Sequence, residues 1–355
     1  MGTSPDPEEA APGPATAPGG MHRRRTLTIA IIAGLVVLAV AAAAFLLNRP
    51  RAQTAAPVET SAPTPAVTPK PTPTPTPDPP PVALNILLIG SDSRVNARAA
   101  AASGKVSDQR ADALVFIHLP ADRRNAYGIS IMRDLWVDIP GYRSAKVNAA
   151  LELGGVPLMT RTVEALLGQR INHTVMLDFQ GFAAMTDALG GVDVTIKEPF
   201  TGTIDNFVHF PRGVNRLNGQ KALAFVRERH AFVDGDFQRV RNQQTFLKAV
   251  MAKMAAEGGL KNRDTVKKVV AKVLPHVTVN PGLTVLTLER LAFSLRNTAP
   301  GKGVFFTLPT GGFGTSFDGQ SIILQDLAAT AAVSAALASG TLGKYVAANK
   351  LQNGN

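Results

Sequence analysis

The sequence predicts an α/β protein in which a central sheet carries helices on both faces. Short apolar runs bounded by polar or turn residues, at 84–90, 113–119 and 127–132, indicate strands. Segments of helical period lie after them, at 157–168 and in the stretch that follows Asp236. Because strands interleaved with helices pack as a sheet covered on two sides, this alternation sets the fold class.

The later part of the chain continues the same alternation. Further strands are expected at 173–179, at 192–196, near Val277 and at 304–308. Further helices are expected at 181–191, 219–224, 265–273 and 287–296, and in the alanine-rich C-terminal region. From about Val82 the chain is long enough to bury one sizeable core.

Residues 27–47 form an uncharged apolar run that would rise about 31 Å as a helix, enough to span a bilayer. The alternative is a cleaved signal peptide, since Ala41–Ala44 offers small residues. The run is longer than a usual signal core and continues through Phe45–Leu47, which favours one uncleaved transmembrane helix. Arg23–Arg25 precede it, so we expect a cytoplasmic N-terminus and an extracytoplasmic remainder, held at the cell membrane.

The segments around this span differ in composition from the folded part. Residues 1–26 are mostly Pro, Ala, Gly and acid, and are interpreted as a disordered cytoplasmic tail. Residues 48–81 are rich in proline and threonine, which predicts a semi-rigid extracytoplasmic stalk in polyproline II. We expect the folded domain at 82–345 and a C-terminal tail at 346–355.

The chain carries a formal charge of +11, from 37 Lys and Arg against 26 Asp and Glu. Such an excess favours an anionic partner: nucleic acid, lipid phosphate or an acidic polymer. The predicted topology makes nucleic acid an unexpected partner. The absence of cysteine excludes disulfides and thiolate chemistry. No HExxH, P-loop or GxSxG motif is present, and the six histidines are scattered.

A cationic stretch from 225 to 254 is the centre of the functional prediction. Arg227 and Arg229 are two residues apart, so in extended backbone both side chains would leave the same side. Asp236 has the character of an N-cap for the helix that follows.

On that helix Arg239 and Gln243 lie on or beside the apolar face, which the wheel gives as Val240, Leu247, Val250 and Met251. Arg241, Asn242, Thr245 and Lys248 fall outside it. A buried charge needs a partner, so Arg239 should meet either a bound anion or, as the alternative, Asp234 or Glu228.

Charged residues also flank the early strands. Asp92 follows the first strand and Asp112 precedes the second. If these two strands are antiparallel neighbours, the two aspartates could share Mg²⁺, with phosphate oxygens as further ligands. The alternative is that both are turn residues. Arg133 and Asp134 follow the third strand, where Arg133 could instead pair with Asp134 or Asp138.

The sequence neighbours of two histidines allow a prediction of their roles. His118 lies inside an apolar run and is expected to be a core residue, whereas His230 could be a spectator or a proton carrier.

Seven blocks in order resemble the LytR-CpsA-Psr family: NILLIGSDSR, RADALVFIHL, SIMRDLWVDIPG, KVNAA, FQGFAAMTDALGGVDVTI, LNGQKALAFVRERH and GDFQRVRNQQTFLKA. They cover about residues 84–254. The resemblance implies a mixed central sheet and a cell-envelope phosphotransferase. Such enzymes move a glycopolymer from a polyprenyl-pyrophosphate carrier to peptidoglycan through a phosphodiester.

The resemblance also implies site residues. The catalytic set would be Asp92, Arg110, Asp112, Arg133 and Asp134, with Asp92 and Asp112 holding Mg²⁺. The pyrophosphate would be held by Arg110, Arg133, Arg227, Arg229, Arg239 and Gln243. Asn148 lies in a matching motif without a definite role. Asn242 departs from the arginine that many members have before the glutamine, and we expect this change to be tolerated because residue 242 lies outside the apolar face.

Two other functions use the same residues. A hydrolase would cleave a lipid pyrophosphate with water as the acceptor. A non-catalytic module would bind anionic wall polymers through its charge and its stalk.

Overall fold

The computed structural model describes residues 82–91, 102–105, 110–204, 207–256, 276–280, 283, 287 and 303–351. The predicted tail, transmembrane segment and stalk lie outside these ranges, as do most of the helices expected at 265–273 and 287–296. Within the described ranges, none of the helices has the length and apolarity that a membrane crossing requires.

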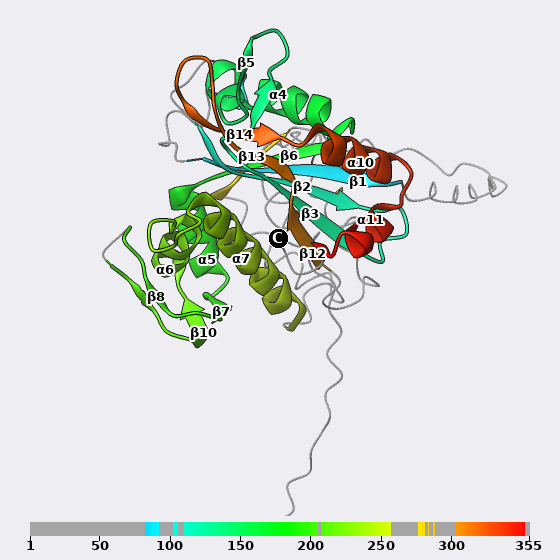
Figure 1. The fold of residues 1–355 in the computed structure, drawn as a ribbon. Coiled ribbons are helices and arrows are strands. Elements are labelled where there is room, and N and C mark those ends of the chain that lie inside the picture. The colour runs from blue at the N-terminus through cyan, green and yellow to red at the C-terminus, as the bar shows by residue number, and fades with distance from the viewer. Residues whose placement is uncertain are drawn as a thin grey trace, which may run out of the picture.

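A six-stranded mixed sheet forms the centre of the molecule (Figure 1). Across the sheet the strands are β11 (Thr278–Val279), β6 (His173–Asp178), β1 (Leu84–Ser91), β2 (Ala111–Leu119), β3 (Ala126–Ile131) and β12 (Gly303–Thr307). β1 runs parallel to β6 and antiparallel to β2, and β3 runs antiparallel to β2 and parallel to β12. The predicted α/β class with a mixed sheet is confirmed.

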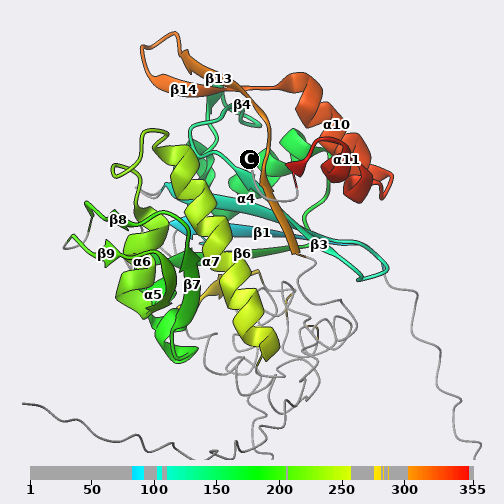
Figure 2. The same cartoon turned by 60° about the horizontal axis from the view of Figure 1, so that its bottom comes forward.

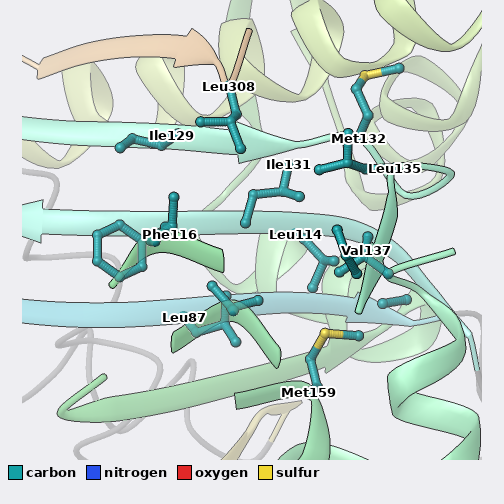
Figure 3. Packing of buried hydrophobic residues seen from close by; sticks show 14 of the residues in the cluster. Leu87, Leu114, Phe116, Ile129, Ile131, Met132, Leu135, Val137, Met159 and Leu308 are labelled. Atoms are coloured by element: carbon teal, nitrogen blue, oxygen red, sulfur yellow. The ribbon is translucent and has the colours of Figure 1, made fainter. Parts of the chain in front are cut away.

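Both faces of the sheet are buried, because successive side chains of each strand point to opposite sides. On β2, Val115 and Ile117 pack into one apolar cluster, and Phe116 between them packs into the other. All six residues of β3 are buried. Figure 3 shows the cluster that contains Leu87 and Phe116.

Among the described residues, helices cover the two faces of the sheet in two groups. One group consists of α4 (Ala149–Leu167), α10 (Leu327–Ala338) and α11 (Leu342–Ala348). The other consists of α5 (Phe179–Ala188), α6 (Gly219–Arg227) and α7 (Asp236–Ala256). Figures 1 and 2 show α7 crossing the sheet on the side opposite to α4.

α4 begins earlier than the sequence predicts. The apolar period indicates a helix from 157, but the helical segment starts at Ala149 and is interrupted at Gly154 and Gly155, where Gly155 has a φ of 61°. Pro157 therefore falls in the first turn after the interruption, where its missing N–H costs no helical hydrogen bond.

The two-stranded pairings outside the main sheet were not predicted. They pair β4 (Trp136–Asp138) with β5 (Ser144–Lys146), β8 (Phe200–Thr201) with β9 (His209–Phe210), β7 (Val192–Ile196) with β10 (Gly213–Leu217), and β13 (Thr310–Thr315) with β14 (Ser321–Gln325). β7 was predicted as a strand, but it belongs to one of these pairs.

Packed structure continues past residue 345, where the sequence places the start of a tail. α11 runs through that position to Ala348, and Leu351 is buried in the same apolar cluster as Val346.

Gly128 gives a test of the β3–β12 pairing. It lies opposite Phe305 in the register, and a Cβ at this position would stand 2.2 Å from a carbon of the Phe305 ring. We expect Gly128→Ala to lower the free energy of unfolding by about 1–3 kcal/mol, the usual cost of overpacking. Denaturant titration measures this, and adding Phe305→Leu should recover part of the loss. Additive losses in the double variant would contradict this packing.

Candidate functional site

One end of the sheet gathers the charged residues of several segments. β1 and β2 are antiparallel with Ser91 opposite Ala111, as the proposed sharing of a cation by their flanking aspartates requires. β6 ends beside β1, with Asp178 opposite Ser91. β3 ends one step away, with Ile131 opposite Leu114. The residues that begin β2, follow β3 and begin α5 therefore meet at this end.

Arg133 connects three carboxylates there. Its Nη1 donates to Asp112 Oδ1 at 2.7 Å, and its Nε lies 3.2 Å from Asp236 Oδ2 and 3.4 Å from Asp134 Oδ2. Burial alone would lower the pKa of Arg133, but Asp236 and Asp112 raise it. The anticipated pairing with Asp134 is thus present as one of three ion pairs, and Lys146 also binds Asp134, at 3.1 Å.

Asp236 is the anion on which the arginines converge. Its carboxylate lies 3.2 Å from Arg133 Nε, 3.3 Å from Arg229 Nη1 and 3.0 Å from Arg239 Nη2. Burial would raise the pKa of Asp236, yet the charges of Arg239 and Arg133 hold it below its ordinary value. The sequence indicated only an N-cap here, so this role was missed.

Arg239 is the most buried of these arginines, with 7% of its side chain exposed. Burial, and next the charge of Arg133, lower its pKa. Asp234 and Glu228 were the expected internal partners, and both expectations are wrong: Asp234 pairs with Arg241, and Asp236 pairs with Arg239. Within the described part of the chain, the buried Arg239 Nε has no acceptor. A buried N–H of this kind is a place where a bound anion would be stabilised.

Arg227 and Arg229 reach the same site from different backbone. The prediction of extended backbone is wrong at Arg227, which ends α6, while Glu228 between them is extended with φ −64° and ψ 131°. Both nevertheless line one cavity. The Arg227 guanidinium lies 4.4 Å from the centre of the Phe179 ring, a cation–π contact that holds it in place.

Glu228 organises the loop that carries Arg229. It is fully buried and accepts hydrogen bonds from the backbone N–H groups of Arg229, His230 and Ala231 and of Thr203 across the loop. Burial would raise the pKa of Glu228, but these backbone donors lower it. A glutamate between two arginines carries no sequence signal for this role.

The cavity itself has a volume of about 300 Å³ and lies between the sheet and α5, α6 and α7. Its interior is apolar, formed by residues such as Leu88, Val175, Phe182, Phe246 and Val250. Its polar lining groups are Asp112, Arg133, Asp178, Arg227, Arg229, His230, Arg239 and Gln243. The site therefore joins a cationic group of residues to an apolar hollow.

Other predicted site residues lie elsewhere or outside the described ranges. Arg110 pairs with Glu152 at 2.9 Å, has 59% of its side chain exposed and is not among the described residues that line the cavity. Asp92 lies outside the described residues. Asn148 is buried before α4, and its side-chain oxygen has no partner within the described part.

Asn242 corrects the helical-wheel analysis. It was placed outside the buried face, but it is buried and its Nδ2 donates to the Phe225 carbonyl at 3.2 Å. Gln244 is also buried and donates to Ser130 and Thr307. α7 lies between the sheet and α6, so it buries more than one face and a single apolar stripe underestimates its contacts.

The two histidines differ. His118 is a core residue as expected: its Nδ1 lies 2.7 Å from Asn85 Oδ1, and burial and Arg123 lower its pKa to about 4. His230 lines the cavity, where Arg229 Nε donates to its Nε2 at 3.2 Å. This bond uses the ring nitrogen as an acceptor and orients the Arg229 guanidinium.

Comparison with known proteins identifies related chains. The model of the LytR_cpsA_psr family matches residues 52–337. The chain is 32% identical over 254 residues to the probable cell wall biosynthesis protein LcpB of Corynebacterium glutamicum, covering 70% of this chain and 59% of LcpB. It is 34% identical over 190 residues to the polyisoprenyl-teichoic acid–peptidoglycan teichoic acid transferase TagU of Bacillus mycoides, covering 53% of this chain and 58% of TagU.

Among solved structures, B. subtilis TagV is similar with a TM-score of 0.62 and 24% identity, over 73% of this chain and 97% of TagV. This similarity shows a shared fold. The chain spans less than two thirds of the length of the two curated relatives named above.

The substitution Asp236→Asn tests how much the ion pairs between Asp236 and the three arginines stabilise the fold. At pH 7 we expect the free energy of unfolding to fall by about 3 kcal/mol, because the buried Arg239 loses its anion. The exposed Asp193, which pairs with Arg216, is the control, and its replacement by asparagine should cost less than about 1 kcal/mol.

The ion pairs of Asp236 also predict how the free energy of unfolding depends on pH. The pKa of Asp236 is lower in the folded than in the unfolded state, where it is 3.8, so its stabilisation is complete above that value and is lost as the pH falls below it. As the pH falls below about 4, the stability of the wild type should therefore fall more steeply than that of Asp236→Asn. Parallel curves in denaturant titrations would contradict this assignment.

Proposed function

Because the chain belongs to the LytR-CpsA-Psr family, we propose that it is a phosphotransferase that attaches a glycopolymer to peptidoglycan. The donor would be a glycopolymer on a polyprenyl-pyrophosphate carrier, and polyprenyl phosphate would be released. The names of TagU and LcpB, relatives in teichoic acid transfer and cell wall biosynthesis, support this substrate class.

The main observation behind the proposal is that four arginines and many apolar residues line the same cavity. Arg133, Arg227, Arg229 and Arg239 all line it. A ligand that matches has a compact anionic group and an apolar tail, which is the chemistry of a lipid pyrophosphate. The head would bind at the arginines and the beginning of the tail among the apolar lining residues.

Electrostatics favours occupation by such a head. Two guanidinium groups about 6 Å apart repel by about 2–3 kcal/mol at an effective dielectric constant near 20. Asp236 offsets part of this repulsion among Arg133, Arg229 and Arg239. A bound pyrophosphate would offset the rest and give the Arg239 Nε an acceptor.

A divalent cation fits the donors at this end of the sheet. Among the described residues, the four arginines and Lys146 face four carboxylates, Asp112, Asp134, Asp178 and Asp236, which leaves 5 − 4 = 1 positive charge. A pyrophosphate diester carries about two negative charges, so a cation is needed for neutrality. We assign Mg²⁺ to Asp112 and Asp92 with phosphate oxygens; when bound, it would stabilise charge that develops on the transferred phosphoryl group.

The reaction requires mainly positioning and charge neutralisation. The acceptor hydroxyl attacks the phosphorus on the sugar side, the bond to the bridging oxygen breaks, and polyprenyl phosphate takes the electron pair. Arg133, Arg227 and Arg229 would stabilise the phosphate oxygens during this step. The hydroxyl proton passes to a carboxylate at this end of the sheet, for which Asp134 is a candidate among the described residues.

The proposed location follows from the sequence. An uncleaved helix at 27–47 would hold the domain outside the cell membrane, and the stalk at 48–81 would set its reach. There the lipid carrier and the peptidoglycan acceptor are both within reach, and nucleic acid is not.

Arg227→Ala combined with Arg229→Ala tests the reaction. With a lipid-pyrophosphate glycan, Mg²⁺ and peptidoglycan, transfer to the wall should fall at least about 100-fold, because two groups that stabilise the transition state are lost. The control is Arg212→Ala with Arg216→Ala, which removes two exposed surface pairs.

The products of the same assay separate the two rival functions. Release of free sugar phosphate at a rate independent of peptidoglycan would indicate a hydrolase. Binding of the polymer without turnover, by the wild type and by the double variant alike, would indicate a non-catalytic module.

Asp112→Asn tests the cation. We expect the Mg²⁺ concentration for half-maximal transfer to rise at least about tenfold, and a chelator to abolish transfer. The control is Asp193→Asn, a carboxylate exposed on β7. Full transfer in the presence of chelator would exclude this role.

A further inference from the structure

The β13–β14 hairpin presents two exposed phenylalanines. Phe313, on β13, is 73% exposed, and Phe317, in the connection between β13 and β14, is 77% exposed. The two strands pair with each other, with a register shift between Thr310 and Phe313. Figure 2 shows β13 and β14 standing beyond the main sheet, close to β4 and to one end of α7. Large exposed apolar rings on one hairpin favour a binding surface.

Contacts with neighbouring rings hold both side chains in fixed orientations. The Phe313 ring lies edge to face with Phe237, with centres 5.8 Å apart at 81°. The Phe317 ring lies edge to face with Trp136 at 6.5 Å and 75°, and the Arg143 guanidinium lies 5.7 Å from its centre. Because one side of each ring is supported, the ring is ordered without a ligand and would lose little entropy on binding one.

The hairpin is attached directly to the candidate site. Ile323 on β14 donates its backbone N–H to the Asp134 carbonyl at 2.9 Å, and it forms a bridge with Leu135. At the other side, Phe237 follows Asp236, the anion that binds three arginines. The aromatic surface therefore begins at the residues next to the cationic group.

Glycines leave the Phe313 ring accessible. Gly311, Gly312 and Gly314 flank Phe313 on the strand, so these sequence neighbours carry no side chain that could cover the ring. Gly312 has a φ of 89°, which favours glycine. At Gly314 a Cβ would lie 2.8 Å from the Leu324 side chain. The close packing of the two strands and the open ring face thus both depend on glycine.

We propose that Phe313 and Phe317, with Trp136 and Arg143, form the surface that binds the glycan strand of the acceptor. Sugar rings present C–H faces that stack on aromatic rings, and Arg143 can donate to hydroxyl or carboxylate groups of the strand. This inference rests on the proposed function. The donor is already held by its pyrophosphate and its lipid, whereas the acceptor has neither and needs a binding surface that extends from the arginines.

Trp136 supplies a direct readout because it is the single tryptophan of the chain. A soluble oligomer of β-1,4-linked N-acetylglucosamine, which has no phosphate and no lipid, should shift the Trp136 emission of the full-length protein. Phe313→Ala with Phe317→Ala should weaken this binding about tenfold. The control is Phe207→Ala, which removes a ring that is also 73% exposed but lies outside the hairpin.

The transfer assay shows which substrate binds the aromatic surface of the hairpin. With saturating donor, the double variant should raise the KM for peptidoglycan about tenfold and leave the KM for the donor unchanged. Unchanged oligomer binding would overturn the proposal, as would a loss confined to donor affinity, to phospholipid vesicle binding or to self-association. Oligomer binding by a wild-type protein that transfers no polymer would count against the proposed reaction and would still support the glycan surface. Denaturant titration of the double variant checks that it is folded.

Discussion

The ion pairs between Asp236 and three arginines are the constraint on which the site depends. Arg133, Arg229 and Arg239 come from the end of β3, the loop after α6 and the first turns of α7, and one carboxylate holds all three. An arginine group without any anion would be too costly to bury, and a fully neutralised one would have no affinity for phosphate. A single shared carboxylate lies between these limits: it preserves the folded geometry and leaves positive charge for a ligand.

The fold supplies the positions through its two apolar clusters. Alternating side chains of β1, β2 and β3 anchor the sheet to helices on both sides, so the strand ends that carry Asp112 and Arg133 have fixed places. α7 packs across the sheet with Phe246 and Val250 buried, which fixes Arg239 relative to Arg133. Glu228 performs the same task locally, since its backbone hydrogen bonds fix the loop that carries Arg229. The cavity remains where these helices do not fill the space above the strands.

Much of this arrangement could be predicted from sequence, and the exceptions have physical causes. Long apolar runs and helical periods are local signals, so the main strands, α7 and the placement of Arg239 on a buried face were predictable. The partner of Arg239 was not, because a helix-starting aspartate has the same sequence whether it caps the helix or binds arginines from elsewhere. Asn242 was misplaced because a wheel assumes one buried face. The hairpins β4–β5 and β13–β14 are short and glycine-rich or polar, so their pairing depends on tertiary contacts rather than on apolar pattern.

The cavity, the arginines and the hairpin lie next to one another in the fold. The apolar cavity lies behind the arginines, and the β13–β14 hairpin lies beside them, joined through Asp134 and Phe237. A lipid pyrophosphate bound with its tail in the cavity would turn its sugar-side phosphorus toward the opening, where a strand on the hairpin would bring its hydroxyl. Because both substrates would then be held on the same packed segments, the sugar-side phosphorus and the acceptor hydroxyl would meet between the cavity and the hairpin, and polyprenyl phosphate would leave on the cavity side.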